Sequence, residues 1–194
     1  IKALTGVNRM ESGKIFFNGC EINPRSTKES QELGISTVYQ EVNLIPYLSV
    51  AENISLGRQP MRFAQVDWKT MNTRAETALA RLNLKLDVTQ TLASYSIAIQ
   101  QMVAIARAVD LSQRLLILDE PTSSLDEQEV AQLFGVIKKL KADGLGIIFI
   151  THFLDQVYQV ADRITVLRNG RLIGAYTVAA LPKVDLITAM IGKE

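Results

Sequence analysis

The sequence predicts an α/β fold with a mostly parallel sheet and an inserted α-helical subdomain, and three observations support this. Two continuous apolar runs, Leu115–Leu118 and Ile147–Ile150, are typical of strands buried on both faces of a parallel sheet. The amphipathic segment Glu127–Asp143 lies between them, and the order strand, helix, strand favours right-handed βαβ units. From Ser49 to Asp110 the apolar residues recur at helical spacing, which predicts a separate helical part.

Short elements are expected before the helical part. The pattern predicts the end of a helix at Ile1–Gly6 and a strand leading into a turn at Lys14–Asn18. A brief helix is expected at Ser26–Leu33 and a second strand at Ile35–Tyr39. Gly6, Gly19 and Gly34 stand where these elements stop or turn, as glycine often does.

The remaining elements follow in chain order. The expected helices and strand of this part are Met71–Leu84, Ile97–Val109, Ile147–Thr151 and Phe153–Val160. A hairpin of Arg163–Arg168 and Arg171–Thr177 is expected around Asn169-Gly170, because Asn-Gly between apolar runs is a strong hairpin signal. We expect one domain, with a core lobe of about residues 1–47 and 111–194 and a helical subdomain of about residues 48–110.

Composition narrows the classes of partner and compartment. Lys and Arg number 21 against 20 Asp and Glu, so no strong electrostatic case arises for nucleic acid or anionic lipid as a partner. Cys20 is the only cysteine, which excludes an internal disulfide and fits a reducing cytoplasm; it is expected to be a packing or surface residue. The apolar runs are too short to cross a bilayer, and no signal-peptide pattern is present.

Two adjacent carboxylates, Asp119 and Glu120, carry the most specific chemical signal. They end the strand Leu115–Leu118, and α/β folds place their ligands at the carboxyl ends of strands. Asp119 could hold Mg²⁺, which prefers carboxylate oxygen, and Glu120 could polarise a water for attack on a phosphate. The alternative is a core strand whose acidic end caps the next helix.

Further polar residues follow at strand ends. Ser123-Ser124-Leu125-Asp126 comes directly after the carboxylates, and His152 comes thirty-two residues after Glu120, at the end of the next apolar strand. Gln40 ends the strand Ile35–Tyr39. Taken alone, His152 would more often be a hydrogen-bonded structural residue and Gln40 usually a surface residue, but their order and spacing predict one site at this edge of the sheet.

This set of residues resembles the ATPase of ATP-binding-cassette (ABC) transporters, a P-loop NTPase-like fold, along essentially the whole chain. By this resemblance, Leu115–Asp119 is the Walker B strand, Glu120 is the catalytic glutamate and Ser123–Asp126 is the D-loop. Gln40 is the Q-loop glutamine, and His152 is the switch histidine. It implies ATP and Mg²⁺ as ligands, with Asp119 and Gln40 organising magnesium and water, Glu120 as general base and His152 keeping the γ-phosphate in register.

The chain is most similar to the sugar-importer class, of the ribose, galactose and galactofuranose type. The stretches that carry this likeness are Ala3–Val7, Ser49–Leu56, Gln100–Ala108 and Thr151–Val157. In that class two cassettes stand in tandem, and Met190–Glu194 resembles the end of the first. The resemblance implies ATP hydrolysis that energises sugar import at the cytoplasmic face of the inner membrane. The sugar is not identified, because a binding protein and membrane subunits choose it.

The signature loop of the family, LSGGQ, corresponds to Tyr95–Ile99. Ser96 is retained at the start of the helix Ile97–Val109, where its hydroxyl, free N–H groups and the helix dipole can meet a phosphate. A serine that only caps the helix would explain the residue equally well. Ile99 replaces a glutamine, so any contact of that side chain with nucleotide is in question.

A phosphate-binding loop, G-x-x-x-x-G-K-[ST] before a helix, is expected upstream of Ile1. The one candidate, Gly6 to Lys14, fails because six residues separate its glycines, Ile15 replaces the hydroxyl residue, and Lys14 leads into a strand. Since that loop provides much of the positioning in phosphoryl transfer, the 194-residue chain alone is expected to bind ATP weakly and not to hydrolyse it.

The resemblance also implies partners. Ser96 would act on the nucleotide of a second cassette, Ser124 and Asp126 would lie at the seam between cassettes, and Glu41–Leu56 would receive the transmembrane permease. A periplasmic sugar-binding protein would be an indirect partner. Two alternatives remain open: a cassette that binds nucleotide without hydrolysing it, and an ABC ATPase outside transport, for which the near-zero net charge gives no support.

Overall fold

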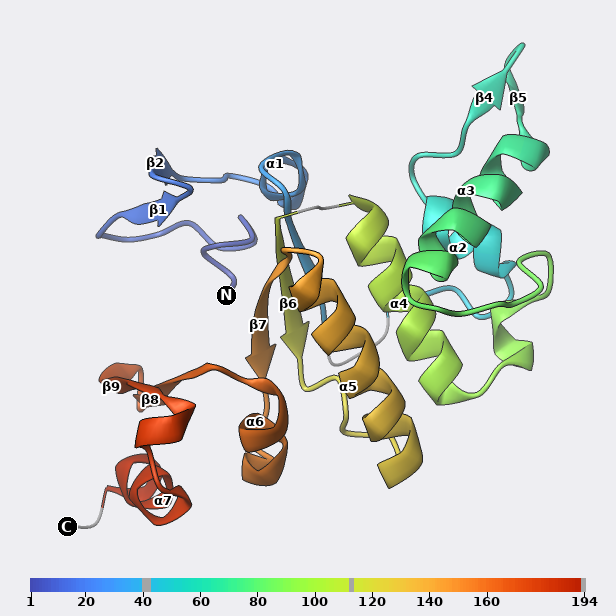
Figure 1. The fold of residues 1–194 in the computed structure, drawn as a ribbon. Coiled ribbons are helices and arrows are strands. Elements are labelled where there is room, and N and C mark those ends of the chain that lie inside the picture. Colours follow the sequence, from blue (N-terminus) through green and yellow to red (C-terminus); the bar gives the residue numbers. More distant parts are fainter. Residues whose placement is uncertain (40–42, 112–113, 193–194) are drawn as a thin grey trace. The chain divides into compact units, whose positions relative to one another are not determined.

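The structure is a computed structural model that describes residues 1–39, 43–111 and 114–192. It divides the chain into two compact units, Ile1–Ile150 and Thr151–Glu194. Figure 1 shows the course of the chain through each unit. Gln40 and Glu41, named above on the sequence, lie outside the described residues.

A parallel three-stranded sheet forms the centre of the first unit. Its strands are β3 (Ile35–Val38), β6 (Leu115–Asp119) and β7 (Gly146–Ile150), in the order β3-β6-β7. Both pairings are parallel, so the predicted α/β class with a parallel sheet is confirmed. Leu116, Ile117 and Leu118 of the central strand are almost fully buried, which explains why this strand is a continuous apolar run.

Helix α5 (Glu127–Ala142) makes the crossover from β6 to β7. Its buried side chains form one stripe that faces the sheet, Leu133, Phe134, Val136, Ile137 and Leu140. The Phe134 ring meets Phe149 of β7 edge to face, with 6.0 Å between ring centroids. Gly144 then takes a left-handed φ of 88°, which ends the helix and returns the chain to the sheet.

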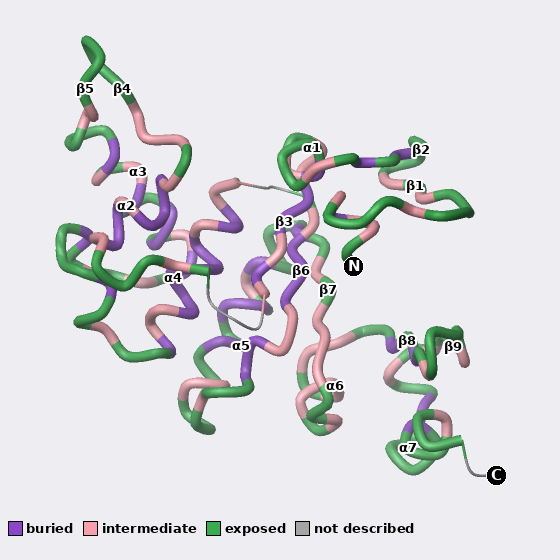
Figure 2. The backbone as a smooth tube through the Cα atoms, turned by 180° about the vertical axis from the view of Figure 1, so that it is seen from behind, coloured by how far each residue is buried: buried purple, intermediate pink, exposed green. Residues whose placement is uncertain are grey.

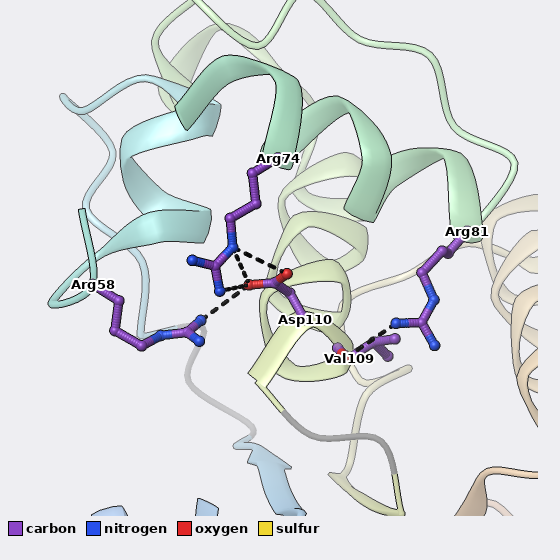
Figure 3. Close-up of polar contacts among 5 residues, drawn as sticks. All are labelled: Arg58, Arg74, Arg81, Val109 and Asp110. Atoms are coloured by element: carbon purple, nitrogen blue, oxygen red, sulfur yellow. Dashed lines mark hydrogen bonds and ion pairs between the residues drawn. The ribbon is translucent and has the colours of Figure 1, made fainter. Parts of the chain in front are cut away.

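Three helices make up the helical part of the first unit: α2 (Val50–Ser55), α3 (Trp68–Arg81) and α4 (Ile97–Leu111). Figure 2 shows buried residues concentrated in α2, α4 and β6. Asp110 near the end of α4 accepts hydrogen bonds from Arg74 of α3, at 2.7 and 3.0 Å to Oδ2, and from Arg58, at 3.1 Å (Figure 3). These ion pairs fix α3 and the segment after α2 to the end of α4.

The N-terminal part contains a hairpin and a short helix. Strands β1 (Ile15–Phe17) and β2 (Cys20–Ile22) pair antiparallel, and α1 (Thr27–Glu32) begins at the N-cap Ser26. Residues 1–8 form hydrogen-bonded turns where the sequence predicted the end of a helix. The Val7 N–H donates to the Lys2 carbonyl at 2.9 Å and Gly6 has a φ of 70°, which is the pattern of a helical C-terminal cap.

The second unit contains α6 (Leu154–Val160), strands β8 (Arg163–Arg168) and β9 (Arg171–Thr177), and α7 (Lys183–Ile191). The hairpin is where Asn169-Gly170 placed it, and both turn residues have positive φ, 51° and 74°. The buried core of the second unit consists of Ile164, Val166, Leu181 and Leu186. Helix α7 was not expected from the sequence.

One hairpin of the first unit was also not expected. Strands β4 (Met61–Arg62) and β5 (Gln65–Val66) pair antiparallel around Phe63-Ala64. Both turn residues have positive φ, 49° and 62°, the pattern of a type I′ turn, although neither is a glycine or an asparagine.

Candidate functional site

The carboxyl end of the central strand β6 presents Asp119 and Glu120. Asp119 is the last residue in register with β7, opposite Ile150, and the Glu120 N–H donates to the Ile150 carbonyl at 2.9 Å. Both side chains are partly buried. The strand thus carries two adjacent carboxyl groups to the edge of the sheet where α/β folds bind ligands.

Glu120 has a left-handed backbone, with a φ of 48°. For a residue with a side chain this conformation costs about 1–2 kcal/mol, and such residues cluster at functional sites. This conformation also ends the extended backbone of β6, so Glu120 does not continue the alternation of side chains along the strand. The chain then turns at once, since Ser123 N–H donates to the Glu120 carbonyl at 3.3 Å.

Asp126, rather than Asp119 or Glu120, caps the next helix. Its carboxylate accepts from the Glu129 N–H at 2.8 Å, and the Glu129 carboxylate accepts from the Asp126 N–H at 3.0 Å, which is a complete capping box. The alternative in which the acidic strand end serves only as a helix cap therefore does not account for Asp119 and Glu120. Ser123 and Ser124 are exposed in the turn between them and the cap.

Ser96 stands directly before α4 and is exposed. Its hydroxyl accepts from the Ile99 N–H at 3.4 Å, a long hydrogen bond, so the capping role foreseen as an alternative is present but weak. Gln100 is nearby and its side chain donates to the Tyr95 carbonyl at 2.9 Å. Ile99 is partly buried in the first turn of the helix.

His152 belongs to the second unit, two residues after the end of β7. Its ring is exposed and lies against Phe153, with ring centroids 4.1 Å apart. The Thr151 hydroxyl accepts from the Phe153 N–H at 3.0 Å and shapes this turn. The structure describes Asp119 and Glu120 in one unit and His152 in the other.

Strand β3 ends beside β6, since Val38 is in register with Leu118. Strand β3 therefore ends at the same edge of the sheet as β6, which carries Asp119. Gln40 itself is outside the described residues. The described part of the chain contains no group of three or more His, Cys, Asp or Glu side chains that could hold a metal ion. Asp119 alone fits Mg²⁺, because this ion commonly takes one or two carboxylates and fills its other positions with water and phosphate.

A polar residue that the sequence did not single out, Asn53, holds the loop that precedes α2. It is fully buried in α2. Its side-chain oxygen accepts from the Ile45 N–H at 2.7 Å, and its amide nitrogen donates to the carbonyls of Ile45, Ser49 and Leu48 at 2.9, 3.0 and 3.3 Å. The sequence signal for this role is an asparagine on the largely apolar face of a short helix.

The loop held by Asn53 exposes apolar side chains. Ile45 and Tyr47 are exposed, and Tyr47 is 86% exposed. Arg107 of α4 donates to the Asn43 carbonyl at 3.2 Å at the start of this loop. Burial, and to a smaller extent the charge of Arg58, lowers the pKa of Arg107. We call residues 43–49 the Asn53-held loop.

Comparisons with known proteins agree with this geometry. The family model described as ABC transporter matches residues 1–123, so the chain belongs to the ABC transporter family. Relatives include the galactofuranose transporter ATP-binding protein of Escherichia coli strain K12, 52% identical, and a ribose import ATP-binding protein of Rubrobacter xylanophilus, 46% identical. Both alignments cover 100% of this chain and 39% of the relative, so the chain spans about two fifths of their length.

Solved structures place the fold in the same family. An ATP-binding cassette of an ABC transporter in its ADP conformation has a TM-score of 0.82 at 21% identity, covering 99% of this chain and 82% of that one. The protein cbiO1 of Clostridium perfringens, part of an ABC transporter complex, has a TM-score of 0.78 at 26% identity, covering 96% and 74%. The fold is therefore that of an ABC ATPase cassette. No helix among the described residues is both long and apolar enough to span a membrane.

Proposed function

We propose that this chain is part of the ATP-hydrolysing cassette of a transporter that imports a sugar. The observation that carries the proposal is the pair Asp119 and Glu120 at the carboxyl end of the central strand, with Glu120 held in a left-handed conformation. The names of the relatives, a galactofuranose transporter ATP-binding protein and a ribose import ATP-binding protein, support sugar as the class of cargo. The protein would work at the cytoplasmic face of the inner membrane.

The carboxylates divide the chemistry of hydrolysis between them. Asp119, together with Gln40, would hold Mg²⁺, which when bound neutralises charge on the phosphates of ATP. Glu120 would accept the proton of the attacking water at its carboxylate. Its left-handed backbone supports this role, because strained residues that persist in a fold cluster at functional sites. His152 would keep the γ-phosphate in register.

A second cassette would complete the site. Ser96 is exposed at the start of α4, and its hydroxyl accepts one long hydrogen bond among the described residues. It would meet the phosphates of a partner's nucleotide at the positive end of the helix. Ser124 and Asp126 would lie at the seam between cassettes. The capping box of Asp126 with Glu129 would give that seam a fixed backbone.

The link to transport would run through the segment Glu41–Leu56, where the permease subunits are proposed to dock. The Asn53-held loop supports this, because a fully buried amide fixes a loop whose Ile45 and Tyr47 are exposed. The core lobe of about residues 1–47 and 111–194 and the helical subdomain of about 48–110 remain our proposed division, with this loop at their junction. A periplasmic sugar-binding protein would deliver the sugar to the permease.

The experiment that tests the proposal is Glu120→Gln in the full-length protein. ATP binding should be retained, while turnover should fall by about 10²-fold or more, since a positioned general base contributes about 10²–10⁴-fold. Glu127→Gln, in the exposed first turn of α5, is the matched control and should leave turnover unchanged. Equal turnover in the Glu120→Gln protein and the wild type would remove Glu120 from the mechanism.

The same experiment addresses the alternative of a cassette that binds ATP without hydrolysing it. Ile99 favours that alternative, because it stands in the signature loop where the family has a glutamine. A non-hydrolysing cassette would lose no turnover when Glu120 is replaced, and the hydrolysis of the full protein would depend on the other cassette.

The 194 residues by themselves are proposed to lack hydrolysis. They contain no G-x-x-x-x-G-K-[ST], and Gly13-Lys14 precedes strand β1 rather than a helix. Since the phosphate loop supplies most of the positioning for phosphoryl transfer, the purified chain should show no magnesium-dependent phosphate release above a protein-free blank. Measurable release that Glu120→Gln abolishes would contradict this.

A further inference from the structure

The β4–β5 hairpin exposes large apolar side chains at one place. Phe63 is 90% exposed, Met61 60% and Trp68 56%. The Asp67 N–H donates to the Pro60 carbonyl at 2.8 Å and closes the base of the hairpin, so Trp68 follows directly on that base as the first residue of α3. Figure 1 shows the hairpin extending past the start of α3. None of these three side chains is accounted for by the core of the first unit.

The turn gives Phe63 a position that its backbone does not favour. Phe63 and Ala64 have φ values of 49° and 62°, where glycine or asparagine would be at ease and a bulky side chain is strained. Phe63 is thus both strained and almost fully exposed, and neither the turn chemistry nor the core of the first unit explains a phenylalanine at this position.

Cationic side chains flank these rings. The Arg62 guanidinium lies 5.4 Å from the centre of the Phe63 ring, and Lys69 is exposed next to Trp68. The only acid between Arg58 and Thr70 is Asp67, whose carboxylate accepts from the Thr70 N–H at 3.1 Å and from its hydroxyl at 2.8 Å. Aromatic rings beside Lys and Arg are the set that gathers at the headgroup level of a membrane.

The size of the surface separates a lipid from a protein partner. An aromatic side chain buries about 150–250 Å², so Met61, Phe63 and Trp68 together offer on the order of 500 Å². A stable protein interface takes about 800 Å² from each partner and needs a complementary surface. A lipid headgroup layer needs no such complement, and it accepts a narrow projecting tip.

We propose that the hairpin surface, defined as Met61, Arg62 and Phe63 of the β4–β5 hairpin with Trp68 and Lys69 at the start of α3, is a membrane-surface anchor. Phe63 and Trp68 enter the boundary between headgroups and acyl chains, and Arg62 and Lys69 meet lipid phosphates. The net charge of +1 gives no long-range attraction, so the binding is short-ranged, weak and reversible. This anchor does not depend on ATP or on the transport function proposed above.

Trp68 is the only tryptophan of the chain, so its fluorescence reports on the hairpin surface alone. The purified chain is mixed with vesicles of phosphatidylcholine, with vesicles that also contain phosphatidylglycerol, and with inorganic phosphate. We expect a blue shift of Trp68 emission and co-sedimentation with both vesicles, stronger with the anionic ones. Inorganic phosphate should have no effect, which distinguishes a lipid surface from a free phosphate as the ligand.

Two variants make the test specific. Phe63→Asn removes the ring and suits the left-handed turn better, so the hairpin keeps its fold while vesicle affinity falls by about tenfold. Lys69→Glu should lower affinity for anionic vesicles by about tenfold and for neutral ones little. Phe16→Ser, which removes an exposed ring from β1, is the control and should bind as the wild type does.

Three results would overturn the proposal. One is the absence of any emission shift or co-sedimentation with either vesicle. Another is equal vesicle affinity of the wild type and Phe63→Asn. The third is the absence of vesicle binding together with self-association in light scattering that Phe63→Asn abolishes. That result would make the hairpin surface a contact between copies of the chain.

Discussion

Two loops of the first unit expose aromatic side chains, but the fold fixes them by different means. In the Asn53-held loop, the fully buried side chain of Asn53 makes four hydrogen bonds to the backbone of the loop itself. In the β4–β5 hairpin, Phe63 sits on a two-residue turn whose own backbone is strained. The first loop takes its shape from the core and the second takes it from local pairing of strands.

This difference suggests different partners. A loop fixed by a buried amide keeps one shape, which suits docking of a folded permease subunit. A two-stranded hairpin is marginally stable by itself, and a lipid surface does not require one shape from it. The comparison predicts that changes beneath the first loop cost stability, whereas changes in the second turn can add it.

The largest effect is expected for Asn53→Ala. It removes the acceptor of the Ile45 N–H, and a buried group that loses its partner costs about 1–3 kcal/mol. The carbonyls of Ile45, Leu48 and Ser49 lose their bonds to the side-chain amide but still accept from backbone N–H groups. We therefore expect a loss of about 2 kcal/mol in the free energy of unfolding. Urea unfolding followed by Trp68 fluorescence measures it.

The control for this change is Asn43→Ala, an exposed asparagine in the same loop. Arg107 donates to its backbone carbonyl, so the side chain can be removed with that bond intact. Stability should change by less than about 0.5 kcal/mol, as at ordinary surface positions. Similar losses in both variants would mean that the buried amide is not what holds the loop.

The role of Asn53 was not predictable from the sequence, because its four partners belong to a loop whose path is set only by the fold. Asp119 and Glu120 were predictable, because a buried apolar strand ends there and the edge of a parallel sheet follows from the alternation of strands and helices. The left-handed backbone of Glu120 was not, since no glycine or asparagine marks it. The cap of α5 at Asp126 follows a Ser/Thr/Asp-x-x-Glu pattern that is visible in the sequence.

The hairpins show the same limit. Asn169-Gly170 and Phe63-Ala64 both adopt two positive φ values, yet only the first pair has the residues that favour this turn. Helix α7 was missed because its apolar residues are not confined to one face: Leu186 is buried while Val184, Ile187 and Ile191 are exposed. Sequence patterns thus located the elements with ordinary signals and missed those whose residues depart from them.

A smaller effect, of opposite sign, is expected in the strained turn. Ala64→Gly places the one residue without a Cβ at a φ of 62°, and the free energy of unfolding should rise by about 1 kcal/mol. The same substitution at Ala131, exposed in the interior of α5, should lower it by about 1 kcal/mol. Urea unfolding of both proteins measures the pair, and equal signs would show that the turn is not strained.

The smallest effect concerns the acid at the base of the same hairpin. The backbone N–H of Thr70, and then its hydroxyl, lower the pKa of Asp67 below that of an ordinary aspartate. A carboxyl group with a lowered pKa in the folded state stabilises the fold above the unfolded pKa of about 3.9, and this contribution is lost as pH falls through the lower folded value. Asp67 is only partly buried and its hydrogen bonds to Thr70 are exposed to solvent, so the contribution is modest.

Asp67→Asn tests this, because asparagine still caps α3 but cannot titrate. Unfolding by urea at a series of acidic pH values should show a shallower loss of stability below about pH 4 in the variant than in the wild type. Thr70→Val, which removes the hydroxyl donor and leaves the N–H, should reproduce part of that change. Parallel pH profiles in all three proteins would show that the carboxylate does not stabilise the base of the hairpin, leaving the Asp67 N–H bond to Pro60 as its closure.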